Sequence, residues 1–295
     1  MKIFIGIPAF NEEKNIAKLI VKLQKISKHI IVCDDGSNDL TGIIAERMGA
    51  HVIKHEKNLG YGAAIGSLFS YSAKSDCDFL ITFDADGQHR VEDIGEILKP
   101  LQNNDADLVI GSRFIDNSTN SKIPKYRKLG IKTITNITKS VVDSDLTDSQ
   151  SGFRGYNNKV LNQLMLSDRG MGISTEILIK ANKLGFRIKE VPIVVLYDGD
   201  TSTHNPISHG TSVVLSTMKY TSIENPLKFY GLPGIIFLIV GGFFILWTLQ
   251  TFSETRQIIT NLSLIGIGSM LLGTILSVTS IILYSLVSVV REHKS

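Results

Sequence analysis

The sequence predicts an α/β fold with a mainly parallel sheet, followed by a C-terminal hairpin of two transmembrane helices. Short apolar runs alternate with stretches of helical periodicity over residues 1–200, which is the order of a parallel sheet covered by helices. Polar residues follow most of the apolar runs. The last third of the chain then holds two long stretches without a charged residue, each long enough to cross a bilayer as a helix.

Length, charge and cysteine content narrow the classes of protein that fit. A chain of 295 residues can bury a large core, and its net charge of +3 is too small to predict a nucleic-acid partner. Cys33 and Cys77 lie in or beside predicted strands, so we expect two reduced core cysteines. The opening MKIFIGIPAF lacks a signal-peptide pattern and is predicted to be the first strand, which places the N-terminal part in the cytosol.

Individual elements follow from hydrophobic periodicity and from turn signals. The predicted strands cover residues 2–7, 29–34, 51–55, 79–84, 107–112 and 187–196. The predicted helices cover residues 16–26, 40–48, 60–73, 91–103 and 173–185. Asn11 is a plausible N-cap for the first helix, because two glutamates follow it. Residues 117–128 are expected to form a mobile loop, and residues 146–156 a polar turn.

The C-terminal third predicts a membrane anchor. The two spans are expected at about 229–251 and 262–290, within a membrane region of 229–290 that follows an N-terminal domain of residues 1–205. The intervening segment 206–228 is moderately amphipathic and suits the bilayer surface. Basic residues flank the outer ends of the hairpin, so the N-terminal domain and both termini are expected in the cytoplasm. Glycines in both spans weakly favour a homo-oligomer: Gly241, Gly242, Gly266 and Gly268.

Polar residues after the predicted strands should meet at one edge of the sheet, because ligands of such folds bind outside the carboxyl ends of the strands. Asp84 and Asp86 follow the fourth strand. Together with Gln88 they could hold Mg²⁺ or Mn²⁺, which favour oxygen ligands; a solvated turn is the alternative. Asp34 and Asp35 end the second strand, where an aspartate can accept a hydrogen bond from a nucleotide base.

A glycine pattern allows a different interpretation. Gly60-x-Gly62-x-x-x-Gly66 follows the third strand, and Asp84 lies about 20 residues further on. This arrangement resembles a dinucleotide fingerprint and keeps an NAD-binding protein open as a weak alternative. The simpler interpretation is a glycine-rich helix start that packs close to the sheet.

Five motifs, in order, carry a family resemblance: IPAFNEE, DDGSND, DADGQH, GSR and SGFR. Residues 1–200 resemble the family 2 glycosyltransferases, and among them the membrane-anchored polyprenyl-phosphate (dolichyl-phosphate) sugar synthases. The resemblance implies a GT-A (Rossmann-like) nucleotide-binding domain. It also implies inverting transfer of a hexose from a GDP- or UDP-sugar to a polyprenyl or dolichyl phosphate, with Mg²⁺ or Mn²⁺ as cofactor. The segment after the last strand departs from the mannose synthases, so the donor sugar stays open.

The resemblance also assigns residues to roles. It implies nucleotide binding by Pro8, Phe10, Glu12, Asp35 and Asp84. It implies metal binding by Asp84, Asp86 and Gln88, and contact with the acceptor phosphate by Arg113, Arg127 and Arg154. Asp86 and Arg113 are accordingly expected to serve catalysis. A dedicated base is optional for a phosphate acceptor, and Asp148 is the catalytic candidate if there is one.

Several alternatives remain at this point. Arg113 could instead be a surface arginine that pairs with Asp116, and Asp148 could cap a loop rather than act as a base. The chain could also be a membrane scaffold that binds a nucleotide sugar without transferring it. Processive polysaccharide synthases of the same family carry a Q-x-x-R-W motif. Trp247 is the one tryptophan of this chain and lies in a predicted span, so processive synthesis is not expected.

Overall fold

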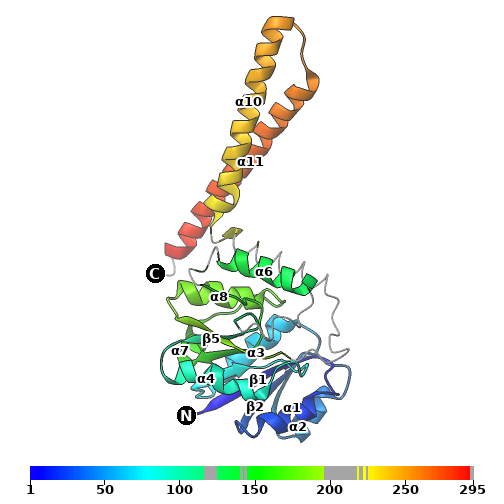
Figure 1. The fold of residues 1–295 in the computed structure, drawn as a ribbon, viewed down its shortest axis with the longest axis vertical. Coiled ribbons are helices and arrows are strands. Elements are labelled where there is room, and N and C mark those ends of the chain that lie inside the picture. The colour runs from blue at the N-terminus through cyan, green and yellow to red at the C-terminus, as the bar shows by residue number, and fades with distance from the viewer. Residues whose placement is uncertain are drawn as a thin grey trace. The chain divides into compact units, whose positions relative to one another are not determined.

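The computed structural model describes residues 1–115, 125–139, 142, 145–195, 218, 222–223 and 225–292. The chain divides into two units, Met1–Thr217 and Met218–Ser295, and each is described by itself (Figure 1). The first unit contains a seven-stranded sheet in the order β3-β2-β1-β4-β6-β5-β7. The strands are β1 Ile3–Ala9, β2 His29–Asp34, β3 His51–Lys54, β4 Phe79–Thr82, β5 Leu108–Ser112, β6 Arg154–Asn157 and β7 Ile188–Pro192.

The sheet is mainly parallel, as predicted, with one exception. β6 runs antiparallel to both neighbours, β4 and β5, whereas the other paired strands are parallel. Sequence analysis assigned this segment to a polar turn and missed the strand. β1 and β2 pair up to Ala9 opposite Asp34, and β1 and β4 pair up to Gly6 opposite Thr82, so their carboxyl ends share one edge of the sheet.

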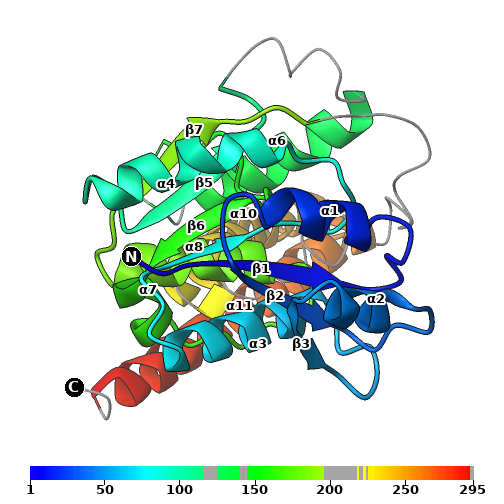
Figure 2. The ribbon, with the colours of Figure 1, turned by 90° about the horizontal axis from the view of Figure 1, so that it is seen from below.

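Helices cover both faces of the sheet (Figure 2). They are α1 Ile16–Leu23, α2 Thr41–Arg47, α3 Tyr61–Lys74, the short 3₁₀ helix η1 Val91–Asp93, α4 Ile94–Gln102, α6 Lys125–Lys139, α7 Asn158–Gln163 and α8 Ile173–Lys183. Apolar residues of α1, α2 and α4 share one core cluster with Ile5, Ile7 and Val32 of the sheet. Gly6 points to the other face, where Leu68 of α3 packs against it. Alternate residues of each strand therefore serve two cores.

Two local predictions near these helices were wrong. Asn11 does not cap the first helix, since α1 begins at Ile16 after Asn15. Asn11 has a positive φ of 56°, and its side chain accepts a hydrogen bond from Asn38 N at 2.9 Å. Residues 125–128, expected to be loop, belong to α6, and the preceding residues 116–124 lie outside the described part of the chain.

The cysteine prediction is confirmed. Cys33 and Cys77 are both free and buried. Burial raises the pKa of each thiol to about 12, with nearby aspartate charges adding to the effect. Both residues therefore behave as small core side chains rather than as reactive thiols.

The glycines before and within α3 have a packing role. Gly60 has a φ of 100°, and a Cβ there would lie 2.3 Å from the carbonyl oxygen of Arg169. The backbone N–H of Gly62 donates to that same oxygen at 2.9 Å. The start of α3 is thus packed closely against the protein's own backbone, which argues against a dinucleotide site. The close approach is to residues 168–170 and not, as the simpler interpretation had predicted, to the sheet.

The second unit is a helical hairpin. A π-helical turn, η2 Leu227–Gly231, leads into α10 Leu232–Thr255, and α11 Thr260–Glu292 returns beside it. The spans Leu227–Thr255 and Thr260–Val289 are long and apolar enough to cross a membrane. A Cβ at Gly241 would lie 3.0 Å from the carbonyl oxygen of Gly266, so these glycines let the two helices approach each other.

Packing within the hairpin thus uses two of the four glycines on which the predicted homo-oligomer rested. At Gly242 and Gly268, an added Cβ would meet no heavy atom of the described residues within 4 Å, apart from local backbone. The oligomer stays a prediction. Of the predicted interfacial segment, residues 206–217 lie outside the described residues.

Gly60→Ala is expected to destabilise the protein by about 2–4 kcal/mol, because alanine is strained at this φ and would collide with rigid backbone. Gly66→Ala on the same helix is the matched control. Its Cβ would meet nothing within 4 Å, so the free energy of unfolding should stay the same or rise by up to about 1 kcal/mol. Urea unfolding of the full chain in detergent measures both. Equal effects of the two substitutions would contradict this account.

Candidate active site

An acidic turn follows β4 at the carboxyl edge of the sheet. Asp84 Oδ1 accepts a hydrogen bond from the hydroxyl of Tyr61 at 3.1 Å, and His89 Nε2 lies 3.5 Å from Asp84 Oδ2. Asp86 Oδ1 accepts from the backbone N–H of Gln88 at 2.9 Å. Gly87, which stands between Asp86 and Gln88, has a φ of 71°, which glycine adopts without strain. The turn therefore presents two carboxylates that are fixed by different donors.

The two carboxylates differ in pKa. Burial, followed by the charge of Asp84, raises the pKa of Asp86 to about 6. Burial also acts on Asp84, but hydrogen bonding and charge from His89, with Tyr61 and Arg113, hold its pKa below the ordinary value. The charge of Glu12 adds to the rise at Asp86, so Glu12 lies near the same turn. Negative charge at this edge exceeds what the surrounding protein compensates.

This donor set fits a divalent cation that also binds a phosphate-bearing ligand. Carboxylate oxygens suit Mg²⁺ and Mn²⁺, which are commonly held by one or two carboxylates together with substrate phosphates. Across the described residues, no group of three or more His, Cys, Asp and Glu side chains is arranged to hold a metal alone. Asp84 and Asp86 could supply the protein oxygens, and the remaining ligands would come from water and substrate.

The aspartates that end β2 organise the loops around them. Asp35 Oδ1 accepts from Leu59 N at 2.9 Å and from His55 Nδ1 at 2.6 Å, and its Oδ2 accepts from Gly60 N at 2.9 Å. His55 Nε2 in turn contacts Ser67 Oγ at 2.9 Å. A carboxylate has about four acceptor positions, so Asp35 retains about one for a further donor. Asp34 accepts from Ser37 N at 3.0 Å and packs against Gly42 of α2.

Residues at the end of β1 lie next to these loops. Pro8 is buried within β1 opposite Cys33, and the half-buried Phe10 directly follows the strand. The backbone N–H of Glu12 donates to the Thr41 hydroxyl at 2.7 Å, and its carboxylate accepts from Asn15 at 2.9 Å. Each predicted nucleotide-binding residue thus belongs to the carboxyl edge of β1, β2 or β4.

A buried ion pair follows β5. Arg113 donates from Nε to Asp148 Oδ2 at 2.6 Å and from Nη2 to Asp148 Oδ1 at 2.8 Å, and Asp148 is 0% exposed. Glu190 of β7 accepts from the backbone N–H of Thr147 at 2.7 Å and from that of Asp148 at 2.8 Å. These contacts favour the loop-organising alternative for Asp148 over a proton-accepting base. Asp116, the other suggested partner of Arg113, lies outside the described residues.

The remaining two predicted arginines differ from Arg113. Arg154 is 1% exposed and donates to the backbone carbonyls of Ser151, Ser174 and Ser149 at 2.8, 2.9 and 2.7 Å. Its guanidinium is committed to holding loops together, so the prediction of an acceptor-phosphate contact does not fit the structure. Arg127 belongs to α6, and its side chain lies outside the described part of the chain.

Four residues of the site were missed by sequence analysis: Tyr61, His89, Gly152 and Glu190. A Cβ at Gly152 would lie 2.5 Å from the Tyr61 hydroxyl oxygen and 2.6 Å from Asp84 Oδ2. His89 stands inside the DADGQH motif and Gly152 inside the SGFR motif, and both were usable signals. Tyr61 and Glu190 come from segments whose approach to the site depends on the tertiary fold.

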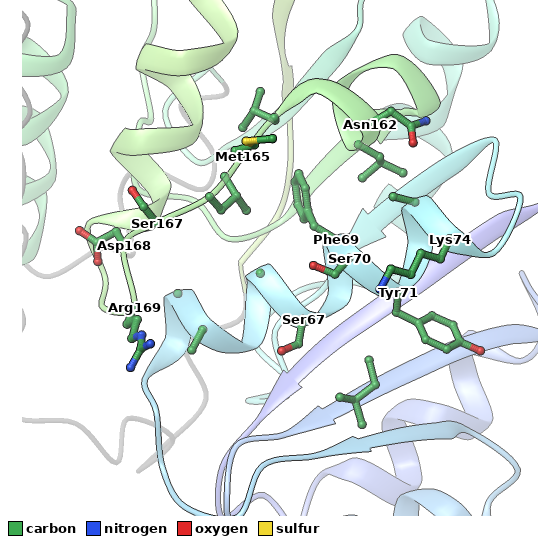
Figure 3. A pocket seen from close by; sticks show the side chains of 18 residues that line it. Ser67, Phe69, Ser70, Tyr71, Lys74, Asn162, Met165, Ser167, Asp168 and Arg169 are labelled. Carbon is green, nitrogen blue, oxygen red and sulfur yellow. The ribbon is translucent and has the colours of Figure 1, made fainter. Parts of the chain in front are cut away.

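A separate groove runs along α3 (Figure 3). Its volume is about 1010 Å³, and residues of α3, α7 and the segment 164–169 line it, including Phe69, Met165 and Arg169. Within the part of the chain that the structure describes, none of the residues predicted to bind donor, metal or acceptor lines this groove. The acidic turn and the groove are therefore different features of the domain.

This fold is that of a glycosyltransferase, and residues 4–165 match the model of the family described as Glycosyl transferase family 2. The chain belongs to that family and is a glycosyltransferase with a GT-A fold. Glucosyl-3-phosphoglycerate synthase from Mycobacterium tuberculosis, solved with Mn²⁺, UDP and product, has the same fold. The TM-score is 0.55 at 20% identity, over 74% of this chain and 79% of that one.

Several relatives are named for lipid-phosphate substrates. The UDP-N-acetylglucosamine–dolichyl-phosphate N-acetylglucosaminyltransferase of Methanococcus voltae is 33% identical, over 72% of this chain and 91% of the relative. The polyprenol monophosphomannose synthase of Mycolicibacterium smegmatis is 30% identical, over 63% of this chain and 74% of the relative. An uncharacterized protein of Methanocaldococcus jannaschii is 37% identical, over 72% of this chain and 87% of the relative.

The Arg113–Asp148 pair is expected to show strong coupling in a double-mutant cycle of unfolding free energies. Arg113→Ala, Asp148→Ala and the double variant should give a coupling of about 1–3 kcal/mol, because Asp148 is fully buried, the Arg113 side chain is 12% exposed and the contact is bidentate. The exposed pair Lys139–Asp145, at 3.2 Å, is the control and should give less than about 1 kcal/mol. Additive effects at Arg113 and Asp148 would show that their contact contributes little.

Proposed function

We propose that this protein is an inverting transferase that moves a hexose from a GDP- or UDP-sugar to a polyprenyl or dolichyl phosphate at the cytoplasmic face of a membrane. The observation that carries the proposal is the acidic turn of Asp84 and Asp86, with the Arg113–Asp148 pair near it, in a chain that ends in an apolar hairpin. The names of the relatives support the acceptor class. They differ in the donor, so either nucleotide fits.

The donor is proposed to bind across the carboxyl ends of β1, β2 and β4. Pro8, Phe10, Glu12 and Asp35 would surround the nucleoside, with the remaining acceptor position of Asp35 available to a base N–H. Asp84, Asp86 and Gln88 would face the diphosphate. A divalent cation bound to these carboxylates would neutralise charge on the departing nucleotide diphosphate. A protein of the same fold solved with Mn²⁺ or Mg²⁺ and UDP supports a divalent cation as cofactor.

The acceptor chemistry needs little from a protein base. An oxygen of the lipid phosphate attacks the anomeric carbon while the bond from that carbon to the nucleotide diphosphate breaks, and the diphosphate leaves with the electron pair. A phosphate monoester has a second pKa near 6, so its oxygen is largely ionised at neutral pH. Catalysis then rests on positioning and charge compensation. The engagement of Asp148 by Arg113 is compatible with this reaction.

Arg113 is proposed to contact the acceptor phosphate, and Arg127 remains a second candidate. Asp86 and Arg113 would serve catalysis directly, and Asp148 would orient Arg113.

The hairpin of residues 229–290 would keep the domain of residues 1–205 beside the lipid substrate, with segment 206–228 at the interface. Basic residues at both outer ends of the hairpin support cytoplasmic termini.

Transfer should depend on the acidic turn. Membranes that contain the protein are supplied with labelled GDP-mannose, UDP-glucose and UDP-N-acetylglucosamine and with polyprenyl phosphate, and labelled lipid is measured. Asp84→Asn and Asp86→Asn should each lower the rate by about 10²-fold or more, because each removes a metal ligand. Asp78→Asn is the control: this exposed residue precedes β4 at the opposite end of the strand and should leave the rate unchanged.

Two results would contradict the proposal. A protein that binds nucleotide sugars but labels no polyprenyl phosphate would support the scaffold alternative. A full rate of transfer in excess chelator would show that the reaction does not need a metal, and would contradict that part of the proposal alone.

Arg113→Lys should raise the apparent KM for polyprenyl phosphate by about ten-fold, because lysine keeps the charge but cannot form the bidentate hydrogen bonds of a guanidinium. The KM for the nucleotide sugar should change little. Arg187→Lys is the matched control, since Arg187 forms the same kind of paired contact with Asp107, at 3.0 and 3.1 Å, at the other edge of the sheet. An unchanged rate at limiting lipid phosphate would move the acceptor site to Arg127.

A further inference from the structure

Tyr61 reaches the acidic turn from a different part of the fold. It is the first residue of α3, and its hydroxyl donates to Asp84 Oδ1 at 3.1 Å. His89 contacts the other oxygen of the same carboxylate at 3.5 Å, the far limit for a hydrogen bond. The shorter contact to Asp84 therefore comes from the tyrosine.

The backbone around Tyr61 is fixed by several buried contacts. Asp35 accepts from the N–H groups of Leu59 and Gly60, the two residues just before Tyr61. The N–H of Gly62, just after it, donates to Arg169 O at 2.9 Å. Restraints on both sides leave the phenol little freedom to leave Asp84.

Gly152 closes the other side of this contact. A Cβ at this position would overlap the Tyr61 hydroxyl at 2.5 Å and both oxygens of Asp84, at 2.6 and 2.8 Å. The carbonyl of Gly152 accepts from the Thr82 hydroxyl at 2.7 Å, and Thr82 stands two residues before Asp84 in the same chain segment. The space for the tyrosine–aspartate contact is thus set by the sheet itself.

The contact has a defined direction. An ionised carboxylate has no hydrogen to donate, so the Tyr61 hydroxyl is the donor and Asp84 Oδ1 the acceptor. Asp84 consequently keeps one oxygen engaged by Tyr61 and presents its remaining acceptor positions elsewhere.

We propose that Tyr61 is a positioning residue that holds the Asp84 carboxylate in the orientation needed to bind a divalent cation; this rests on the proposed function, in which Asp84 and Asp86 bind the metal. Carboxylates that bind metals are commonly held by a further hydrogen bond, and loss of that partner typically lowers metal affinity by about 10–100-fold. Gly152 serves the same contact by leaving space for it.

The test measures Mn²⁺ binding to the full chain in detergent, from the electron paramagnetic resonance signal of free Mn²⁺, with UDP and separately with GDP present. Tyr61→Phe removes the hydroxyl and keeps the ring, and should raise the Mn²⁺ Kd about ten-fold. Tyr71→Phe makes the same chemical change on the same helix, where the tyrosine stacks on His51, and should leave the Kd within about two-fold. Asp84→Asn should abolish detectable binding.

A second variant and a rescue separate positioning from general damage. Gly152→Ala should weaken Mn²⁺ binding at least as much as Tyr61→Phe, since its Cβ would displace both partners. Excess Mn²⁺ should restore sugar transfer by Tyr61→Phe to near the wild-type maximum, which a misfolded enzyme would not show.

The outcomes distinguish the inference from its premise. A wild-type Kd for Tyr61→Phe, with binding lost in Asp84→Asn, would overturn the role of Tyr61 and leave the metal site intact. If Tyr71→Phe weakened Mn²⁺ binding as much as Tyr61→Phe, the positioning role of Tyr61 would be overturned as well. Wild-type binding by Asp84→Asn would instead show that the proposed metal site is wrong, and the inference would fall with it.

Discussion

Like-charge repulsion at the end of β4 is the constraint around which this domain is arranged. Asp84 and Asp86 stand one residue apart in a half-buried turn, where Coulomb repulsion is stronger than in water. The protein compensates one carboxylate through Tyr61 and His89 and leaves the other with a pKa of about 6. This difference in compensation is the electrostatic basis of the proposed cation site. The elements that approach it, from α3 to β6, are those that meet at the carboxyl edge of the sheet.

The same residue type serves two purposes at this edge, and hydrogen-bond donors distinguish them. Asp148 has both oxygens engaged by a guanidinium and is closed to solvent, and most acceptor positions of Asp35 are filled by backbone and histidine. Such carboxylates are saturated by the protein and stabilise loops. Asp86, whose contact is a backbone amide of its own turn, retains acceptor capacity. Counting donors around each carboxylate therefore shows which of them the protein saturates, and motif membership does not show this.

The sequence predicted those parts of the fold that depend on local pattern. The parallel strands and helices α1 to α4 follow from periodicity, and the strand ends identified the edge where polar residues gather. β6 escaped detection because Arg154–Asn157 is short and polar, and it becomes a strand by inserting between β4 and β5. α6 contains several threonines and isoleucines, whose β-branched side chains lower helix propensity, and a glycine, so its sequence is a weak signal for a helix. The Arg113–Asp148 contact joins residues 35 apart, a pairing that motif order does not specify.

The antiparallel strand β6 also imposes an order on how the domain is completed. During synthesis the N-terminal segments emerge first, and β1 to β4 can pair without the rest of the chain. β4 then presents an unpaired edge until Asn157, the partner of Phe79, has been made. Exposed strand edges invite association with other chains. The nascent sheet is therefore open beside the future acidic turn until the ribosome has added the residues from the end of β4 at Thr82 to Asn157, about a third of the domain.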